Sequence, residues 1–324
     1  MPPSRTTTFS VLDPTSPLGR ELAEGIARSL PDVGLRWFHT RADDESLIVE
    51  IAGGAALVPP LSDPDELSGS SAVVVTQRPE RGVADRLLAW LSRNRDVALL
   101  DCSQPGIAPR ESRCVADRPP AGGAGAPWVH LADPSLAAPV RFVAALGSLE
   151  PRALHLTVIC PVAPLGEGAL DELAQQGAAR LSGQRVKRPH LLPAPLAFDL
   201  SPAPPERVAL LEAQLGELLP GVRSMVHAVD AGVFHGTMAT LLVRCAAAPT
   251  EERVRGLVRA AGGFRMARRD EVLTTTAAVE HGASITCTGV RLAGEWVAAS
   301  LLADGLAVGG AGAALEIARS LSGR

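Results

Sequence analysis

Five cysteines are the most reactive nucleophiles in this sequence, and their spacing limits what they can do. They are Cys102, Cys114, Cys160, Cys245 and Cys287. Their number is odd and no two are close together, whereas zinc sites and disulfide frameworks use short, paired spacings. We therefore expect neither a metal site nor a disulfide framework. Cys160 closes an apolar run that predicts a strand, so it is either a candidate nucleophile at a strand end or a small buried apolar residue.

A hydroxyl and an imidazole are the other candidate catalytic groups. Ser135 lies in ADPSLAA, just before a segment with helical spacing, and His235 lies in VFHGT. Serine is a weak nucleophile without an adjacent base, and the sequence Asp133-Pro134-Ser135 is also typical of a turn that begins a helix. His235 is an alternative base, or else a half-buried histidine of a strand.

Metal or Schiff-base chemistry finds little support in the remaining residues. On an extended strand, His227 and His235 would share a face but Asp230 would not, so these residues do not predict a metal site. The sequence contains one lysine, Lys187, and no tyrosine. Schiff-base chemistry would therefore depend on one residue of a short basic segment, residues 185–190, which we expect to be a solvated loop.

Composition and charge exclude several classes of protein. The 324 residues are 46% hydrophobic and 20% charged, as in a soluble globular protein that is long enough for two domains. The net charge of -4 provides no basic surface for nucleic acid or an anionic membrane. The segment MPPSRTTT lacks the apolar core of a signal peptide, and no run of about 18 apolar residues is present. We expect a cytoplasmic protein.

The first half of the sequence alternates between strand and helix patterns. Strands are predicted at 8–12, 34–38, 71–76, 97–101 and 128–132, and helices at 18–29, 83–93 and 137–147. Nearly continuous apolar strands separated by helices indicate a parallel sheet covered on both faces. Right-handed crossovers then give a doubly wound fold with a ligand crevice at the carboxyl ends of its strands. The Pro/Gly-rich segment 115–127 is a candidate domain boundary.

The second half has longer strands and fewer helices between them. Strands are predicted at 151–161, 222–233, 237–247, 284–292 and 295–302, and helices at 166–181, 206–218, 249–261 and 305–322. Long strands joined by short turns favour an antiparallel or mixed sheet with helices on one face. A broad sheet of this kind often packs against a copy of itself, so we expect a homodimer.

Seven stretches, in order, resemble motifs of one enzyme family. They are DPTSPLG, LLDCS, LADPSLAAPV, VAPLGEGALDEL, PLAFDL, GVFHGT and LLADGLAVGGAGAALEIA. Over nearly its whole length the sequence resembles aspartate-semialdehyde dehydrogenase and its close bacterial homologues. The resemblance implies an α/β protein with a Rossmann-like doubly wound parallel sheet domain at 1–133, of the NAD(P)-binding type. The C-terminal helix 303–324 would complete it, and residues 134–302 would form an α+β dimerisation and substrate domain with a mixed or antiparallel sheet.

The resemblance also implies a reaction whose key residues are missing. In the family, a cysteine thiolate at a helix N-terminus forms a thioacyl intermediate, a histidine moves protons, and NADPH delivers hydride to reduce an aspartyl phosphate. The alignment places Leu136 at the cysteine and Thr237 at the histidine. It places Cys160 at the glutamine that assists the cysteine, and His235 at the arginine that grips the substrate. A slip of one residue brings Ser135 to the cysteine position, so Cys160, Ser135 and His235 are the fallback catalytic candidates.

The turn that would bind the cofactor also lacks expected residues. Of the three glycines in the dinucleotide fingerprint only the third remains, as Gly19, while Asp13 and Ser16 replace the first two. A carboxylate at Asp13 would repel a pyrophosphate, and Pro14 and Pro17 remove two N–H donors from the turn. Ordinary NADP binding is therefore not expected.

Some groups near the turn are still candidates for a nucleotide contact. Thr15, Ser16 and Gly19 would lie at the phosphate position, with Thr15 or Ser16 capping the helix. Arg41 follows the second predicted strand, where some members of the family recognise the 2'-phosphate. Arginine is abundant in this sequence, however, and an ordinary surface position is the favoured explanation.

Two functional hypotheses follow. The first is a divergent, non-catalytic homologue, a pseudoenzyme that binds no cofactor and acts as a dimeric scaffold or binds an unknown protein or small metabolite. The second is an active oxidoreductase of the same type with relocated catalytic residues, such as Cys160 or Ser135 with His235, and NADP as cofactor. An ordinary NADP-dependent dehydrogenase would require the alignment to be wrong at both motifs.

Overall fold

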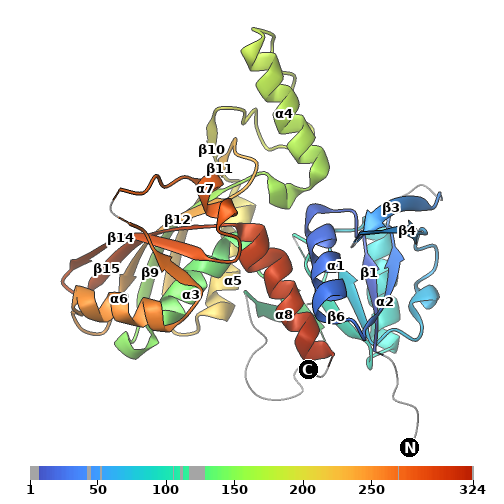
Figure 1. The fold of residues 1–324 in the computed structure, drawn as a ribbon, viewed down its shortest axis with the longest axis horizontal. Helices are drawn as coiled ribbons and strands as arrows, with labels where there is room; N and C mark the ends of the chain where they lie inside the picture. Colours follow the sequence, from blue (N-terminus) through green and yellow to red (C-terminus); the bar gives the residue numbers. More distant parts are fainter. Residues whose placement is uncertain are drawn as a thin grey trace, which may run out of the picture. The chain divides into compact units, whose positions relative to one another are not determined.

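The computed structural model describes residues 7–41, 45–51, 53–104, 106–109, 112–116, 128–268 and 270–322 (Figure 1). Contacts between Cα atoms divide the chain into two compact units. Unit 1 comprises residues 1–131 and 310–324, and unit 2 comprises residues 132–309. Most of the predicted boundary segment, residues 117–127, lies outside the described residues.

Unit 1 is built on a parallel sheet, as the sequence predicted. Its strand order is β2-β1-β5-β6-β8-β7, and every neighbouring pair is parallel. The strands are β1 (Thr8–Leu12), β2 (Gly34–Phe38), β5 (Ala72–Val75), β6 (Ala98–Asp101), β7 (Arg113–Val115) and β8 (Trp128–Leu131). All residues of β5 and β6 are buried, and all are apolar except Asp101 at the end of β6.

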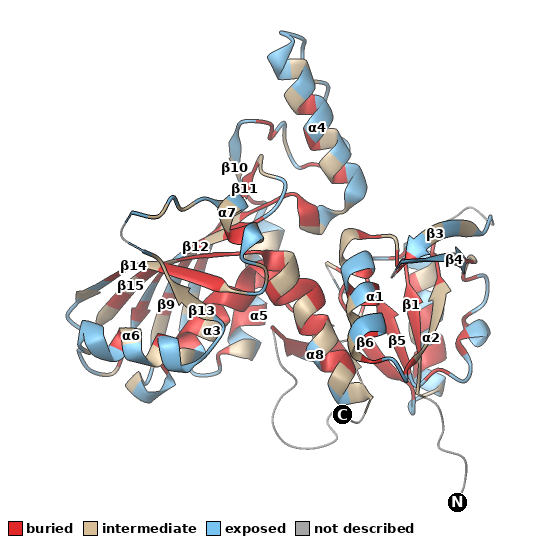
Figure 2. Ribbon diagram, in the orientation of Figure 1, coloured by how far each residue is buried: buried red, intermediate tan, exposed pale blue. Residues whose placement is uncertain are grey.

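Helices cover both faces of this sheet (Figure 2). Helices α1 (Pro17–Ser29) and α8 (Ala311–Leu321) pack together on one face, where Ile26 and Ile317 join one apolar cluster. The other face carries α2 (Arg81–Arg93), whose Trp90 is 2% exposed. The hairpin of β3 (Leu47–Ile51) and β4 (Gly54–Val58), which the sequence analysis did not predict, packs against α1.

Unit 2 is built on a mixed sheet of seven strands, again as predicted. Its order is β10-β11-β9-β12-β15-β14-β13. The pairs β9–β11 and β13–β14 are parallel and the others are antiparallel. The strands are β9 (Ala153–Cys160), β10 (Leu200–Pro202), β11 (Arg223–Ala231), β12 (Thr237–Arg244), β13 (Phe264–Met266), β14 (Ile285–Ala293) and β15 (Trp296–Ala303).

The helices of unit 2 lie mostly on one face of this sheet (Figure 2). That face is covered by α3 (Ala137–Ala145), α5 (Pro205–Leu218) and α6 (Glu251–Ala260). Burial alternates along the central strands, with buried residues on the helix side. The short α7 (Thr275–Glu280) lies beside β15, and α4 (Glu167–Leu181) extends away from the sheet (Figure 1).

One predicted strand end in unit 2 was wrong. Strand β11 ends at Ala231 rather than at residue 233, because Gly232 lies against the passing segment around Leu196. An ideal Cβ at Gly232 would lie 1.9 Å from the carbonyl oxygen of Leu196. The predicted last helix does begin at residue 305, but residues Leu306–Gly310 form a π-helical turn before α8.

The helices differ from membrane-spanning segments in length and composition. Within the described ranges, no helix combines the length and the apolarity that a membrane crossing requires.

Candidate functional site

The turn between β1 and α1 in unit 1 is held by a carboxylate where a dinucleotide-binding turn has glycine. Asp13 has a φ of 57°, the left-handed conformation that glycine normally supplies. Its carboxylate accepts hydrogen bonds from the Thr40 amide at 2.8 Å and the Thr40 hydroxyl at 2.6 Å. The Asp13 amide donates to the Phe38 carbonyl at 2.8 Å. The side chain therefore fastens the turn to the end of β2.

Ser16 uses its side chain to begin the helix. Its hydroxyl oxygen accepts from the Gly19 amide at 3.0 Å, which makes Ser16, rather than Thr15, the N-cap of α1. Ser16 also hydrogen-bonds to the Thr76 hydroxyl at 2.9 Å. Thr76 in turn donates to the carbonyls of Leu12 and Asp13, at 2.8 and 2.7 Å. The polar groups of the turn thus satisfy one another.

Gly19 has a packing reason to remain glycine. An ideal Cβ at this position would lie 2.7 Å from the Asp13 carbonyl oxygen and 2.8 Å from the Pro14 Cα. Both contacts are to backbone atoms, so no rotamer change relieves them. The third glycine of the fingerprint is therefore retained for close approach of helix and turn, a role that needs no cofactor.

The other two predicted cofactor residues lie in separate pockets of unit 1. Arg41 is exposed and lines a pocket of about 300 Å³. Arg86 and Glu80 line the same pocket, so its charges are mixed. Thr15 lines a pocket of about 440 Å³, which is also lined by Arg20, Glu24 and Glu50.

These residues do not fit a pyrophosphate. Such a group needs backbone N–H donors that face it and a positive local field. Here the Gly19 amide already donates to the Ser16 hydroxyl, and prolines remove two further N–H donors. Asp13, which places a carboxylate within the turn, is 7% exposed. Burial raises the pKa of Asp13, against the lowering effect of its hydrogen bonds to Thr40. We derive no step through NADP.

The loop after β6 is also held by hydrogen bonds to a buried carboxylate. Asp101 is fully buried, and its carboxylate accepts from the Ser103 amide and hydroxyl and from the amides of Ile107 and Ala108. Burial raises the pKa of the neighbouring Cys102 thiol well above its usual value, and the charge of Asp101 adds to the rise. Cys102 is therefore not an activated thiol.

In unit 2, the segment that precedes α3 contains the predicted nucleophile positions. Asp133 accepts from the Ser135 amide at 2.9 Å and from the Ser135 hydroxyl at 2.6 Å, which closes a helix-entry turn. Leu136 is 0% exposed and Ser135 is 3% exposed. The residue that the sequence analysis aligned with the family cysteine, Leu136, is therefore a fully buried hydrocarbon side chain.

A buried ion cluster supports this turn. Arg207 on α5 donates to Asp230 on β11 at 2.7 Å and to Asp133 at 3.3 Å. The side chains of both aspartates are 6% exposed and that of Arg207 is 17% exposed. Burial raises the pKa of Asp230, while Arg207 opposes the rise. Gln214 also contributes, because its side-chain oxygen accepts from the Asp133 amide at 3.0 Å.

Cys160 lies beside this cluster. A hydrogen bond links its thiol to the Ser135 hydroxyl, so the structure brings two of the fallback candidates together. Burial raises the pKa of Cys160 to about 12, with Asp133 and Asp230 adding to the rise and Arg207 opposing it. At pH 7 roughly one thiol in 10⁵ would be a thiolate. The residue is 1% exposed and behaves as a small buried side chain.

His235 does not join the other two candidates. It is exposed in the connection between β11 and β12, so the expectation of a half-buried strand histidine was wrong. The cause is the early end of β11, together with a φ of 83° at Gly236. Among the described residues, no contact of its side chain with Cys160 or Ser135 is recorded.

Thr237, which the sequence analysis aligned with the family histidine, is 6% exposed at the start of β12. An ideal Cβ at Gly305 would lie 2.8 Å from its hydroxyl oxygen, and one at Gly309 would lie 2.7 Å from the Pro134 carbonyl. The π-helical turn and the preceding Gly305 therefore pack closely against Pro134 and Thr237. Sequence reasoning missed Arg207, because nothing local in the chain marks a partner that is 74 residues from Asp133.

Comparison with known proteins bears on the fold. No protein-family model matches the sequence, and no curated protein sequence resembles it significantly. Aspartate-semialdehyde dehydrogenase II from Vibrio cholerae superposes with a TM-score of 0.83 at 16% identity, covering 98% of each chain. A probable aspartate-semialdehyde dehydrogenase from Pseudomonas aeruginosa gives a TM-score of 0.82 at 20% identity, covering 97% of this chain and 98% of its own. This chain has the aspartate-semialdehyde dehydrogenase fold.

A more distant structure carries the cofactor. The enzyme from Candida albicans, solved with NADP, superposes with a TM-score of 0.71 at 12% identity, covering 98% of each chain. At such identities the likeness establishes the fold alone. Within that fold, this chain has a buried leucine at position 136, a turn held by Asp13 and a Gly19 amide capped by Ser16.

Proposed function

We propose that this chain is a non-catalytic protein with the aspartate-semialdehyde dehydrogenase fold that acts as a homodimeric scaffold. The observation that carries the proposal is the state of the thiol nearest the family nucleophile position. Cys160 is buried with a pKa of about 12, and Leu136 beside it has no reactive atom. Removing a nucleophile normally lowers the rate by many orders of magnitude. All five cysteines are free, which fits a reducing compartment, and we propose the cytoplasm.

The first test is nucleotide binding together with turnover. NADP and NADPH are titrated into the full chain by calorimetry, and phosphate-dependent oxidation of aspartate semialdehyde is assayed beside it. The Vibrio cholerae dehydrogenase serves as positive control. We expect no saturable binding at 1 mM nucleotide, about a thousandfold above a micromolar affinity, and no turnover. Saturable binding with turnover would overturn the non-catalytic proposal.

The alternative is an active oxidoreductase with relocated catalytic residues and NADP. One observation favours it, the hydrogen bond between Ser135 and Cys160. It predicts a thiol that reacts with iodoacetamide in the native protein at pH 7.5, and turnover that is lost in Cys160→Ser. The non-catalytic proposal predicts that no thiol reacts until the chain is unfolded, because every cysteine is buried.

The homodimer is tested separately from the chemistry. Light scattering on the full chain at neutral pH is expected to give twice the chain mass of 33.6 kDa. A mass of one chain at every accessible concentration would remove the dimer and leave the loss of catalysis to stand or fall on the first test.

A further inference from the structure

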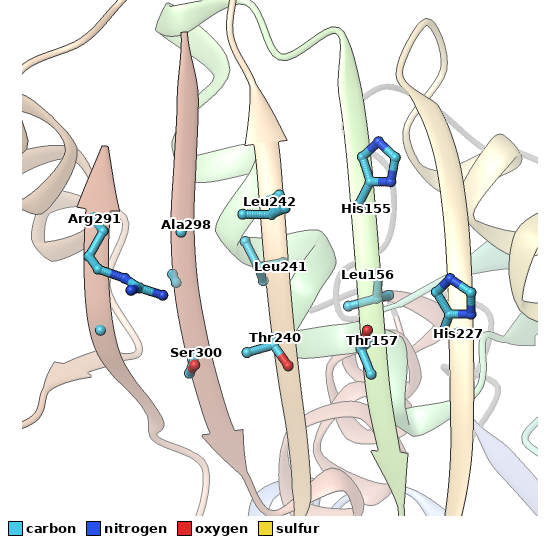
Figure 3. A pocket seen from close by; sticks show the side chains of 12 residues that line it. His155, Leu156, Thr157, His227, Thr240, Leu241, Leu242, Arg291, Ala298 and Ser300 are labelled. Carbon is cyan, nitrogen blue, oxygen red and sulfur yellow. The ribbon is translucent and has the colours of Figure 1, made fainter. Parts of the chain in front are cut away.

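Two hollows in unit 2 differ in the charge of the side chains around them. One has a volume of about 230 Å³ and lies on the outer face of the seven-stranded sheet, which α3, α5 and α6 leave open (Figure 3). Imidazoles and hydroxyls such as those of His155, His227 and Thr157 line it, together with one cation, Arg291. The other has a volume of about 240 Å³ and lies between α4 and the segment that follows it. Three cations line this second hollow, Arg185, Lys187 and Arg188.

The segment that forms the wall of the second hollow is held in place by α4. The chain reverses direction after this helix at Gly183, which has a φ of 70°. Glu172 of α4 then fixes the returning segment through three hydrogen bonds. Its carboxylate accepts from the amides of His190, Leu191 and Leu192 at 2.6, 2.9 and 2.9 Å. The three cations therefore lie between the reversal and these hydrogen bonds, and the Glu172 carboxylate is already bound to three N–H donors.

The cations of this hollow have no partner to neutralise them. For the part of the chain that the structure describes, no ion pair or hydrogen bond is recorded for the side chains of Arg185, Lys187 and Arg188, and all three residues are exposed. Among the described residues that line the hollow, Glu172 is the one acidic group, so the cations exceed the carboxylate by two when His190 is neutral. Like charges that are held together repel one another, and a bound anion of matching charge would relieve this repulsion.

A buried amide group of this hollow is also left without a partner. Gln176 of α4 lines the hollow and is 5% exposed. Its Oε1 accepts from the amides of Leu196 and Ala197 at 2.9 and 3.3 Å, which fixes the orientation of the side-chain amide. Its Nε2, within the described residues, has no hydrogen-bond partner. Because buried donors are nearly always paired, this donor is an independent sign that an acceptor binds here.

We infer that this hollow binds the phosphate group of a small phosphate monoester. Arginine presents a planar fork of donors to phosphate oxygens and lysine adds a mobile point charge, so the three cations suit this group. A phosphate monoester carries close to two negative charges at neutral pH, which matches the excess of two positive charges. The side-chain amides of Gln175 and Gln184, which also line the hollow, favour a ligand whose remaining part has hydroxyls.

The size and the charge of the site limit what else could bind. The volume of about 240 Å³ is below the about 300 Å³ at which pockets for drug-sized ligands begin. A whole dinucleotide does not fit, so the expectation that NADP does not bind is unchanged. Three cations on one short segment also fall short of the basic stripe that a nucleic-acid-binding protein presents. The site shares no residue with the cluster around Cys160, and it rests neither on the homodimer nor on the loss of catalysis.

The test is calorimetric titration of the full chain with glycerol 3-phosphate at neutral pH and about 0.15 M salt. We expect one site per chain, a dissociation constant below about 1 mM, and no binding of glycerol. The double variant Lys187→Gln/Arg188→Gln should weaken binding at least about tenfold, because it removes two charge-assisted contacts. Arg253→Gln/Arg259→Gln removes two exposed charges from α6 and is the matched control, which should bind as the wild type does.

A third variant tests the unpaired donor. Gln176→Glu keeps an acceptor for the amides of Leu196 and Ala197 but replaces the donor by an oxygen, so binding should again weaken at least about tenfold. Unchanged binding by a variant whose circular dichroism shows the native fold would overturn the inference. If Gln176→Glu does not fold, Lys187→Gln/Arg188→Gln decides the matter, because both of its positions are exposed.

Three further outcomes would overturn the inference. One is the absence of saturable binding of both glycerol 3-phosphate and inorganic phosphate up to about 10 mM. Another is that Lys187→Gln/Arg188→Gln binds as tightly as the α6 control. The last is displacement of glycerol 3-phosphate by a lower concentration of a short single-stranded RNA, which would assign the segment to nucleic acid. Turnover or a monomeric chain in the tests described above would leave this site unaffected.

Discussion

Two regions of unit 2 differ in what they do with their polar side chains. Around Ser135 and Cys160, every carboxylate and hydroxyl is bound to another group of the same cluster. On the outer face of the sheet, no hydrogen bond of the side chains of His227, Thr157 and Thr240 is recorded within the described residues. The first region is complete by itself, whereas the second offers donors and acceptors to another surface.

The comparison indicates which of the two regions is available for association with another surface. The cluster around Cys160 is a structural unit, since each partner keeps another from being buried unpaired. The polar groups of this cluster bond to one another, and these bonds hold α3, α5 and β11 together. Unsatisfied groups on an open face cost nothing while they are in water, so they are available for association. Four predictions break or sharpen this contrast.

The largest expected effect is in the ion cluster. Arg207→Ala leaves Asp133 and Asp230 buried without their cation, and we expect a loss of about 3–5 kcal/mol in the free energy of unfolding. Arg244→Ala breaks an ion pair that is 46% and 42% exposed and should cost less than about 1 kcal/mol. Urea unfolding of both variants measures the difference. Equal losses would mean that the cluster is no more buried than the surface pair.

The next effect comes from packing in the β1–α1 turn. Gly19→Ala brings a Cβ against backbone atoms of Asp13 and Pro14, and we expect a loss of about 1–3 kcal/mol. Gly256→Ala in α6 is the matched control, because no atom lies within 4 Å of its ideal Cβ. It should gain about 0.5–1 kcal/mol from helix propensity. A gain in the free energy of unfolding of both variants would show that the turn can accommodate a Cβ at residue 19 without strain.

The sequence predicted the architecture better than the site. A buried parallel strand such as β5 is recognisable because uninterrupted β-branched and apolar residues fit a sheet covered on both faces. The ordering of turns and helices likewise gave the correct fold class. The position of His235 was wrong because the end of β11 depends on the packing of Gly232 against Leu196, a contact between segments far apart in the sequence.

The ion cluster could not be predicted for a related reason. Arginine is abundant, and only the fold brings Arg207 next to Asp133 and Asp230. The sequence alone does show that residue 136, a leucine, has no reactive atom, because this conclusion depends only on the residue type. The hydrogen bonds that hold the β1–α1 turn, such as those from Thr40 to Asp13, required the structure.

The same substitution in two regions gives the third prediction. Thr76→Ala removes a buried hydroxyl that donates to the carbonyls of Leu12 and Asp13, and should cost about 1–3 kcal/mol. Thr240→Ala removes an exposed hydroxyl and should change the free energy of unfolding of the monomer by less than about 0.5 kcal/mol. Thermal unfolding in dilute solution compares them. A large cost for Thr240→Ala would show that the open face already has partners within the monomer.

The smallest expected effect is the pH dependence contributed by Asp13. Burial raises its pKa in the folded state above the unfolded value of about 3.9. A raised pKa means that the folded state binds the proton more tightly, so this contribution to stability is greatest below that value. It is lost as pH rises through the folded pKa. Asp13→Asn has no such proton, and the stability difference between wild type and variant should fall as pH rises.

Urea unfolding of both proteins between pH 4.5 and 7.5 measures that difference and cancels the titration of every other group. A difference that grows with pH would mean that the two hydrogen bonds from Thr40 outweigh burial and hold Asp13 ionised. The turn would then be stabilised by the negative charge of a buried carboxylate. In either case the carboxylate acts within the turn, because its oxygens accept from Thr40 and do not face an open pocket.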